Sequence, residues 1–157
     1  MGLDMYLYLR KYESCGSWTP NYESRKVDFY PQELAEFGKE IDERNFMSKE
    51  SLYRVGYWRK ANAIHKWFVD LADGEDKCQK IYVSLKRIKD LKTIVNRVLN
   101  TPELAKDLLP VCEGSLFGST DYDEWYFEDL KYTKDLLDRV IVLAEKYDYD
   151  IVYQASW

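Results

Sequence analysis

The sequence is poor in the residues that most often carry enzymatic chemistry. It contains a single histidine, His65, and three cysteines, Cys15, Cys78 and Cys112, which have no CxxC spacing. These counts argue against a zinc site, and an odd number of dispersed cysteines is typical of a reduced cytosolic chain. The sequence also lacks a Gly-x-Gly-x-x-Gly run, a Walker pattern and a nucleophile motif. We therefore expect no metal and no cofactor, and we assign no catalytic residue.

Long hydrophobic runs and an excess of basic residues are also missing. No apolar run approaches the length of a membrane span, and the first residues show no signal-peptide pattern, so we expect a cytoplasmic protein that does not contact a membrane. The 23 basic residues are outnumbered by 28 acidic ones, which gives a net charge of −5. This balance argues against direct binding of nucleic acid, which ordinarily needs a basic excess.

Charge is unevenly distributed along the chain. Residues 77–97 contain seven basic residues and one acidic residue, whereas residues 121–150 contain ten acidic residues and four basic ones. Such opposed segments can dock within a domain or between copies of a chain, or they can form solvated faces. The last alternative is the commonest.

Aromatic residues are abundant. The chain has 14 tyrosines, five tryptophans and six phenylalanines, which together make up 16% of its residues. Aromatic side chains can fill a core, and they can also form binding surfaces, because tyrosine offers a rigid apolar ring with one polar tip. Composition leaves both alternatives open.

Hydrophobic periodicity predicts one α+β domain over residues 1–157. Alternation near the N-terminus places Leu3, Met5, Leu7 and Leu9 on one face of a strand. Ser84 is well placed as the N-cap of a helix. The pattern indicates a small, mostly antiparallel sheet with strands near residues 3–10, 51–57, 81–83 and 149–156, and helices near residues 31–44, 59–72, 85–99 and 122–147.

The first candidate site is a dense polar and aromatic cluster at residues 56–68, where a strand is expected to run into a helix. Amides of a first helical turn can hold an anion, and neighbouring cations would add to that attraction. In the functional interpretation the indoles stack on a base and the cations bind a phosphate. In the structural interpretation the histidine bonds internally and fastens the helix to the sheet. The candidate ligand-binding residues are Tyr57, Trp58, Arg59, Lys60, Asn62, His65 and Trp67.

The second candidate site covers residues 114–126 and continues into the predicted long helix. Thr120 and Asp123 resemble a capping box, which is the favoured structural interpretation, whereas the acidic helix start would suit a ligand hydroxyl or amine. Ser119, Thr120 and Tyr122 are the candidate ligand-binding residues here. Asp129 falls inside the apolar arc of the helix, so we expect it to pair with His65, Arg54 or Arg59 as a structural bridge or as a pocket wall.

Three segments of the sequence carry a resemblance. The run GYWRKANAIHKWF at residues 56–68, the opening MGLDMYL, and FGSTDYDE at residues 117–124 together resemble a widespread family of small uncharacterised phage and prophage proteins. The likeness covers roughly residues 1–12 and 52–140. It implies an accessory protein that acts in the cytoplasm of an infected bacterium, and it carries over no catalytic or binding residue.

In that setting three functions compete. We favour a non-catalytic sponge, meaning a protein that sequesters a small nucleotide-type signalling molecule of a bacterial defence system, such as a cyclic nucleotide. The alternatives are an acidic inhibitor that occludes a host defence protein, in the manner of an anti-CRISPR protein or a DNA mimic, and an enzyme that degrades the messenger with His65 as acid or base. We also expect a homo-oligomer, because aromatic pockets often close between subunits.

Overall fold

The computed structural model describes residues 2–16, 18, 20, 47–114 and 116–157. Contacts divide the chain into two compact units, one formed by Met1–Arg10 with Tyr53–Trp157 and the other by Lys11–Leu52. The predicted helix at residues 31–44 lies outside the described residues. Most described residues of the second unit belong to strands, over residues 11–15 and 47–52. Within this unit, Lys49 Nζ lies 3.9 Å from Glu13 Oε2.

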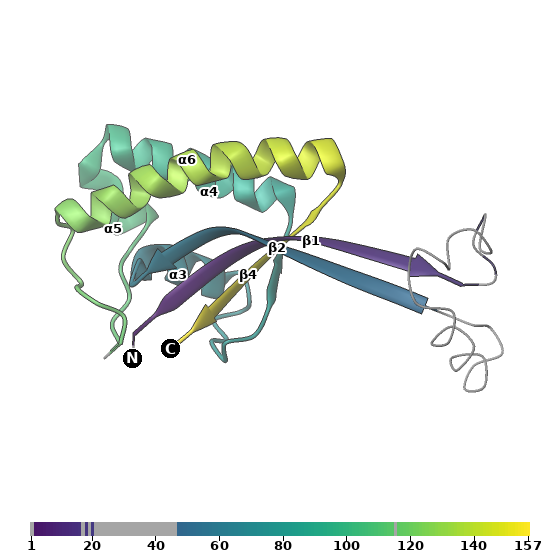
Figure 1. The fold of residues 1–157 in the computed structure, drawn as a ribbon. Coiled ribbons are helices and arrows are strands. Elements are labelled where there is room, and N and C mark those ends of the chain that lie inside the picture. Colours follow the sequence, from purple (N-terminus) through teal and green to yellow (C-terminus); the bar gives the residue numbers. More distant parts are fainter. Residues whose placement is uncertain (1, 17, 19, 21–46, 115) are drawn as a thin grey trace. The chain divides into compact units, whose positions relative to one another are not determined.

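The larger unit is built on a four-stranded antiparallel sheet, which confirms the expected α+β fold. The strands lie in the order β2-β1-β4-β3, so the first and last strands of the chain are neighbours at the centre (Figure 1). Strand positions roughly match the predicted ones, although β1 and β2 are longer than expected. The strands are β1 (Asp4–Cys15), β2 (Met47–Arg59), β3 (Ile81–Val83) and β4 (Asp150–Ser156).

The register of β1 against β4 explains the alternation seen in the sequence. Leu7 pairs with Tyr153 and Leu9 with Ile151, and all four side chains are buried. The intervening residues of β1 point to the other face, where they are only partly buried. A strand with one face in the core and one face outside must alternate in this way.

The helices follow the predicted positions with shifted ends. Ser84 caps α4 as expected, because its side chain accepts a hydrogen bond from the backbone of Arg87. Helices α4 and α6 lie side by side on one side of the sheet (Figure 1). The helices are α3 (Asn62–Asp70), α4 (Leu85–Asn100), α5 (Ala105–Leu108) and α6 (Glu124–Tyr147), with a single 3-10 turn, η1 (Pro102–Leu104).

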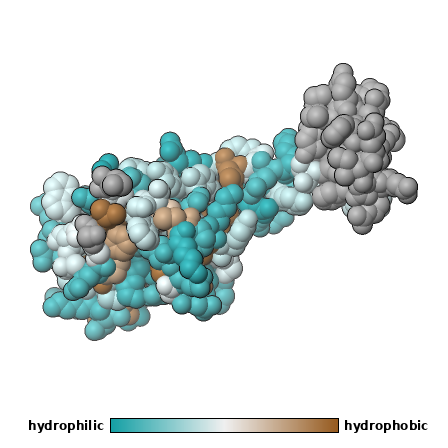
Figure 2. Space-filling model, turned by 90° about the horizontal axis from the view of Figure 1, so that it is seen from below, coloured by the Kyte–Doolittle hydropathy of each residue, from teal (hydrophilic) through white to brown (hydrophobic). Residues whose placement is uncertain are grey.

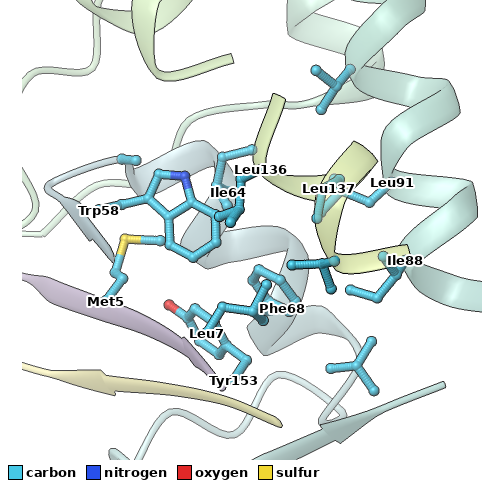
Figure 3. Packing of buried hydrophobic residues seen from close by; sticks show 14 of the residues in the cluster. Met5, Leu7, Trp58, Ile64, Phe68, Ile88, Leu91, Leu136, Leu137 and Tyr153 are labelled. Atoms are coloured by element: carbon cyan, nitrogen blue, oxygen red, sulfur yellow. The ribbon is translucent and has the colours of Figure 1, made fainter. Parts of the chain in front are cut away.

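The core between sheet and helices is aromatic at its centre (Figure 3). The ring of Phe68 from α3 stacks on the ring of Tyr153 from β4, with centroids 4.0 Å apart and an interplanar angle of 8°. Gly56 lets β2 approach α6, because a Cβ at this position would collide with Leu136. The aromatic surplus therefore serves the core in part. Among the described residues no helix is both long and apolar enough to cross a bilayer.

Candidate functional site

The two clusters identified in the sequence meet in the structure through Asn62. This buried side chain donates from Nδ2 to the carbonyl oxygens of Phe117, at 3.2 Å, and Ser119, at 2.7 Å. The backbone carbonyl oxygen of Asn62 accepts from Cys112 Sγ at 3.4 Å. Asn62 therefore holds the loop before α6 against the start of α3 and is not available to a ligand.

The junction between β2 and α3 differs from the prediction. Arg59 ends β2, Lys60 adopts a left-handed conformation with φ 62°, and α3 begins only at Asn62. The prediction that Arg59 and Lys60 flank the first-turn amides of a helix starting at residue 59 is therefore wrong. The reversal at Lys60 brings the loop close, since a Cβ at Gly118 would lie 3.0 Å from the Cβ of Lys60. Gly118 itself has φ 91°, a conformation that favours glycine.

The two tryptophans expected to stack on a base belong to the packing of the protein. Trp58 is only 2% exposed, and its Nε1 donates to Thr133 Oγ1 of α6 at 2.8 Å. Trp67 is half-buried, and its ring lies edge-to-face on Phe68 with centroids 5.1 Å apart. Because the ring of Trp58 is enclosed and hydrogen-bonded in this way, it offers no free face to a nucleobase. The sequence pattern could not show this, because an indole at a strand end is equally compatible with either environment.

His65 lies at the centre of a buried hydrogen-bonded network, which confirms the structural interpretation. Its Nδ1 lies 2.7 Å from the Tyr153 hydroxyl of β4, and its Nε2 lies 2.9 Å from Asp76 Oδ2. A carboxylate only accepts hydrogen bonds, so in the neutral ring Nε2 carries the proton and Nδ1 accepts from Tyr153. Burial, with a contribution from the charge of Asp76, raises the pKa of Tyr153 well above its ordinary value. The phenol therefore stays neutral and serves as a donor.

An open pocket begins where this network reaches the surface. We call it the aromatic–acidic pocket; its volume is about 370 Å³, and it is lined by Asp76, Glu113, Gly114, Leu116, Phe117 and Trp157. Trp157 is 46% exposed, and its Nε1 donates to Asp76 Oδ1 at 3.2 Å. The rings of Phe117 and Trp157 lie edge-to-face with centroids 5.9 Å apart. This size falls within the range of small-molecule sites.

Arg59 and Lys60 lie near one wall of this pocket. A Cβ at Gly2 would be 3.2 Å from Cε of Lys60, 3.7 Å from Nη2 of Arg59 and 4.0 Å from the carbonyl oxygen of Leu116. Leu116 lines the pocket, whereas neither cationic side chain is part of its lining. Arg59 and Lys60 are thus near Leu116 but outside the lining, and no predicted ligand-binding residue lines this pocket.

Tyr57 does not belong to this pocket. Its hydroxyl donates to Asp4 Oδ1, and its ring lies 5.5 Å from the ring of Tyr6 on the sheet. The hydrogen bond to the Asp4 carboxylate is the largest of the effects that raise the pKa of Tyr57. The predicted ligand contact is replaced by a link between β1 and β2.

The residues before α6 surround a second, much smaller cavity of about 50 Å³. A space of this size holds a few waters at most and excludes a nucleotide. Its lining includes Ser119 and Asp129 of the predicted set, together with Lys60 and Asn62. The sequence analysis assigned these residues to two separate candidate sites, and the cavity in which they meet is too small for the expected ligand.

The start of α6 also differs from the expected capping box. The cap is Asp123, whose carboxylate accepts from the backbone N–H of Tyr126 at 3.1 Å, whereas Thr120 is exposed outside the helix. The hydroxyl of Tyr122 accepts from the backbone N–H of Val111 at 3.3 Å. The Tyr122 hydroxyl thus bonds a neighbouring backbone group, and Thr120 does not cap the helix. Asp at the N-cap position is itself a preferred residue, so the helix needs no box.

Asp129 does not make the predicted pair. His65 is taken by Tyr153 and Asp76, and within the described part of the chain no ion pair reaches the Asp129 carboxylate. Burial is the main reason that the pKa of Asp129 rises to about 6, and the charge of Asp123 adds to the effect. The carboxylate lies instead on the wall of the small cavity.

This unpaired carboxylate predicts a pH-dependent stability. The folded pKa of about 6 exceeds the unfolded value, so the folded state binds more protons between roughly pH 4 and 6 and stability falls as the pH rises through that interval. Asp129→Asn should raise the free energy of unfolding at pH 7 by about 1 kcal/mol, after allowance for solvent screening, and change little at pH 4. Urea denaturation at both pH values measures this. Asp107→Asn, at an exposed position, is the control, and an equal effect of Asp129→Asn at both pH values would contradict the prediction.

Sequence reasoning missed Asp76, Glu113 and Trp157. Asp76 lies between the predicted helix near residues 59–72 and the predicted strand near residues 81–83, and Trp157 follows the predicted last strand, whose partner the sequence does not indicate. The end of β4 places Trp157 in the same pocket lining as Glu113 and Phe117. Within the described residues no group of three or more His, Cys, Asp or Glu side chains is arranged to hold a metal ion. Comparison with protein-family models, curated proteins and solved structures finds no match to this chain.

Proposed function

We propose that the protein binds a small nucleotide-type molecule in the aromatic–acidic pocket and retains it unchanged. The observation that carries this proposal is the combination of two aromatic rings and two carboxylates in a cavity of about 370 Å³, with Arg59 and Lys60 outside the lining but on the side of Leu116. A nucleotide needs these three elements: a stacking surface for the base, hydrogen-bond partners for its edge, and a cation for its phosphate.

The base would occupy the pocket itself. Trp157 offers an exposed indole for stacking, and its position is held by the hydrogen bond to Asp76. Carboxylates accept hydrogen bonds, so Asp76 and Glu113 suit the amino groups and ring N–H groups of a base. The same two charges repel a phosphate, which fixes the orientation of the ligand with its base inward.

The phosphate would lie outside the pocket, on the side of Leu116. There Arg59 and Lys60 supply two positive charges. Arginine can hold two phosphate oxygens at once through its planar guanidinium, and lysine adds a point charge. Both cations are exposed, so binding of the phosphate should weaken as salt is added.

The geometry favours binding over turnover. The histidine, which is the residue best suited to proton transfer near neutral pH, is 1% exposed, and both ring nitrogens are taken by protein partners. Asp76 is the one member of this network that lines the pocket, and it accepts from His65 and Trp157. A base or nucleophile that acts on a bound nucleotide would need a free position facing it.

The resemblance to small phage and prophage proteins suggests a biological role for this binding, namely to counter a bacterial defence system. A protein that holds a nucleotide messenger of a bacterial defence system lowers its free concentration, and it needs no catalytic group to do so. In this proposal the protein is such a sponge in the cytoplasm of the infected cell.

The test is retention followed by release. Purified protein is incubated with a panel of cyclic dinucleotides, cyclic trinucleotides and cyclic ADP-ribose isomers, separated from free ligand, and heat-denatured. The proposal predicts that one class is retained, is released intact, and raises the Tm of the protein by mass action. Release of a changed product would support the enzyme, and retention of no nucleotide would overturn the proposal.

One observation favours the second candidate, an acidic inhibitor of a host protein. Trp125 near the start of α6 is 79% exposed and is flanked by Glu124 and by Glu128 one turn later, both exposed. Exposed tryptophans are frequent anchors of protein interfaces. Two results together would support the inhibitor function: retention of no nucleotide, and loss of binding to a host protein in Trp125→Ala.

A further inference from the structure

We propose that the aromatic–acidic pocket selects a guanine-type base, and that Glu113 reads it. This inference rests on the proposed function and adds the identity of the base. It follows from which polar groups of the pocket have no protein partner and from whether those groups donate or accept hydrogen bonds.

The side chains that line the pocket offer acceptors and no free donor. The two carboxylates accept only, and the single polar donor of the aromatic rings, Trp157 Nε1, is spent on Asp76. The remaining side chains of the lining, those of Leu116 and Phe117, are apolar. The side chains of the pocket therefore favour a base that presents donors.

The two carboxylates differ in availability. One oxygen of Asp76 accepts from His65 and the other from Trp157, so this group is anchored to the protein. Glu113 is exposed, and among the residues that the structure describes it makes no hydrogen bond or ion pair. Glu113 is thus the group with two free oxygens to turn toward a ligand.

Two adjacent acceptors select a base with two adjacent donors. The guanine edge carries a ring N–H beside an exocyclic amino group, which can bond both oxygens of one carboxylate, as an arginine fork does. Adenine and cytosine each place an amino group beside a ring nitrogen that only accepts, so one carboxylate oxygen would face a lone pair. Uracil places its single ring N–H between two carbonyl groups. Of the common bases, guanine alone satisfies Glu113.

Calorimetric titration of the full chain tests this with guanosine, adenosine, inosine and uridine monophosphates. Guanosine monophosphate should bind about tenfold or more tightly than adenosine monophosphate, in line with the discrimination of a good bidentate pair. Inosine monophosphate lacks the exocyclic amino group and should fall between the two.

Glu113→Gln provides the sharper test. A glutamine offers one acceptor and one donor, which match the adenine edge and can no longer accept from both adjacent donors of guanine, so the preference for guanosine monophosphate should disappear or reverse. Glu113 is exposed, and the variant should fold as the wild type does. Glu103→Gln, at an exposed position outside the pocket, should leave the preference unchanged.

The outcomes separate the two proposals. Equal affinity for guanosine and adenosine monophosphates, or a guanine preference that survives Glu113→Gln, overturns this inference and leaves the binding function standing. Failure to bind any nucleotide, in this titration and in the retention experiment, overturns the proposed function and this inference with it.

Discussion

Replacing His65 with alanine should lower the free energy of unfolding by about 3 kcal/mol, because the substitution removes two buried hydrogen bonds and leaves a cavity in the core. The side chain is 1% exposed and joins α3 to β4 through Tyr153 and to the 71–80 connection through Asp76. The Tyr153 hydroxyl would then be left buried without this partner. For a chain of this length the expected fall in Tm is roughly 6 to 12 °C. Urea and thermal denaturation measure both quantities.

The next residue supplies the control. Lys66 pairs with Asp70 one turn along the surface of α3, with Nζ 2.6 Å from Oδ2. Lys66→Ala should cost about 0.5 kcal/mol or less, as surface pairs on helices do. If His65→Ala were as mild as Lys66→Ala, His65 would not be the structural link that we infer.

Replacing Trp157 with alanine should reduce nucleotide affinity by roughly 10- to 100-fold, since stacking of a base on an aromatic ring contributes about 1–3 kcal/mol. The substitution removes the exposed ring of the aromatic–acidic pocket and frees Asp76 Oδ1. The ring is 46% exposed, so the loss of stability should be small beside the loss of binding. Titration with guanosine monophosphate measures the change in affinity.

Trp125 is the matched control for this variant. It is more exposed than Trp157 but lies at the start of α6, away from the lining of the aromatic–acidic pocket. Trp125→Ala should bind guanosine monophosphate as the wild type does. A similar loss of affinity in both variants would indicate non-specific stacking on surface indoles and not a site.

The fold was largely predictable because its signals are local. Alternation in β1 reflects one buried face, and the Ser84 cap reflects one backbone N–H, that of Arg87, three residues away. Patterns of this kind depend on neighbours in the sequence, and they position strands and helices to within a few residues. The left-handed backbone at Lys60 had no such signal, and it shifted the start of α3.

The candidate site was much less predictable because it depends on contacts distant in sequence. Trp58 bonds Thr133, 75 residues away, and Trp157 bonds Asp76, 81 residues away. Which of two tryptophans is enclosed and which is exposed follows from such contacts, not from the residues beside each of them. The aromatic rings that line the aromatic–acidic pocket are therefore Phe117 and Trp157 and not the predicted Trp58 and Trp67.

Nuclear magnetic resonance of the indole N–H groups tests the central claim most directly. The five tryptophans give five separate probes, and the Trp157 signal can be assigned because it disappears in Trp157→Phe. On titration with guanosine monophosphate, the account predicts a large shift of the Trp157 indole and little change at the enclosed Trp58. A saturating shift at Trp58 with none at Trp157, or no shift at any indole, would contradict it.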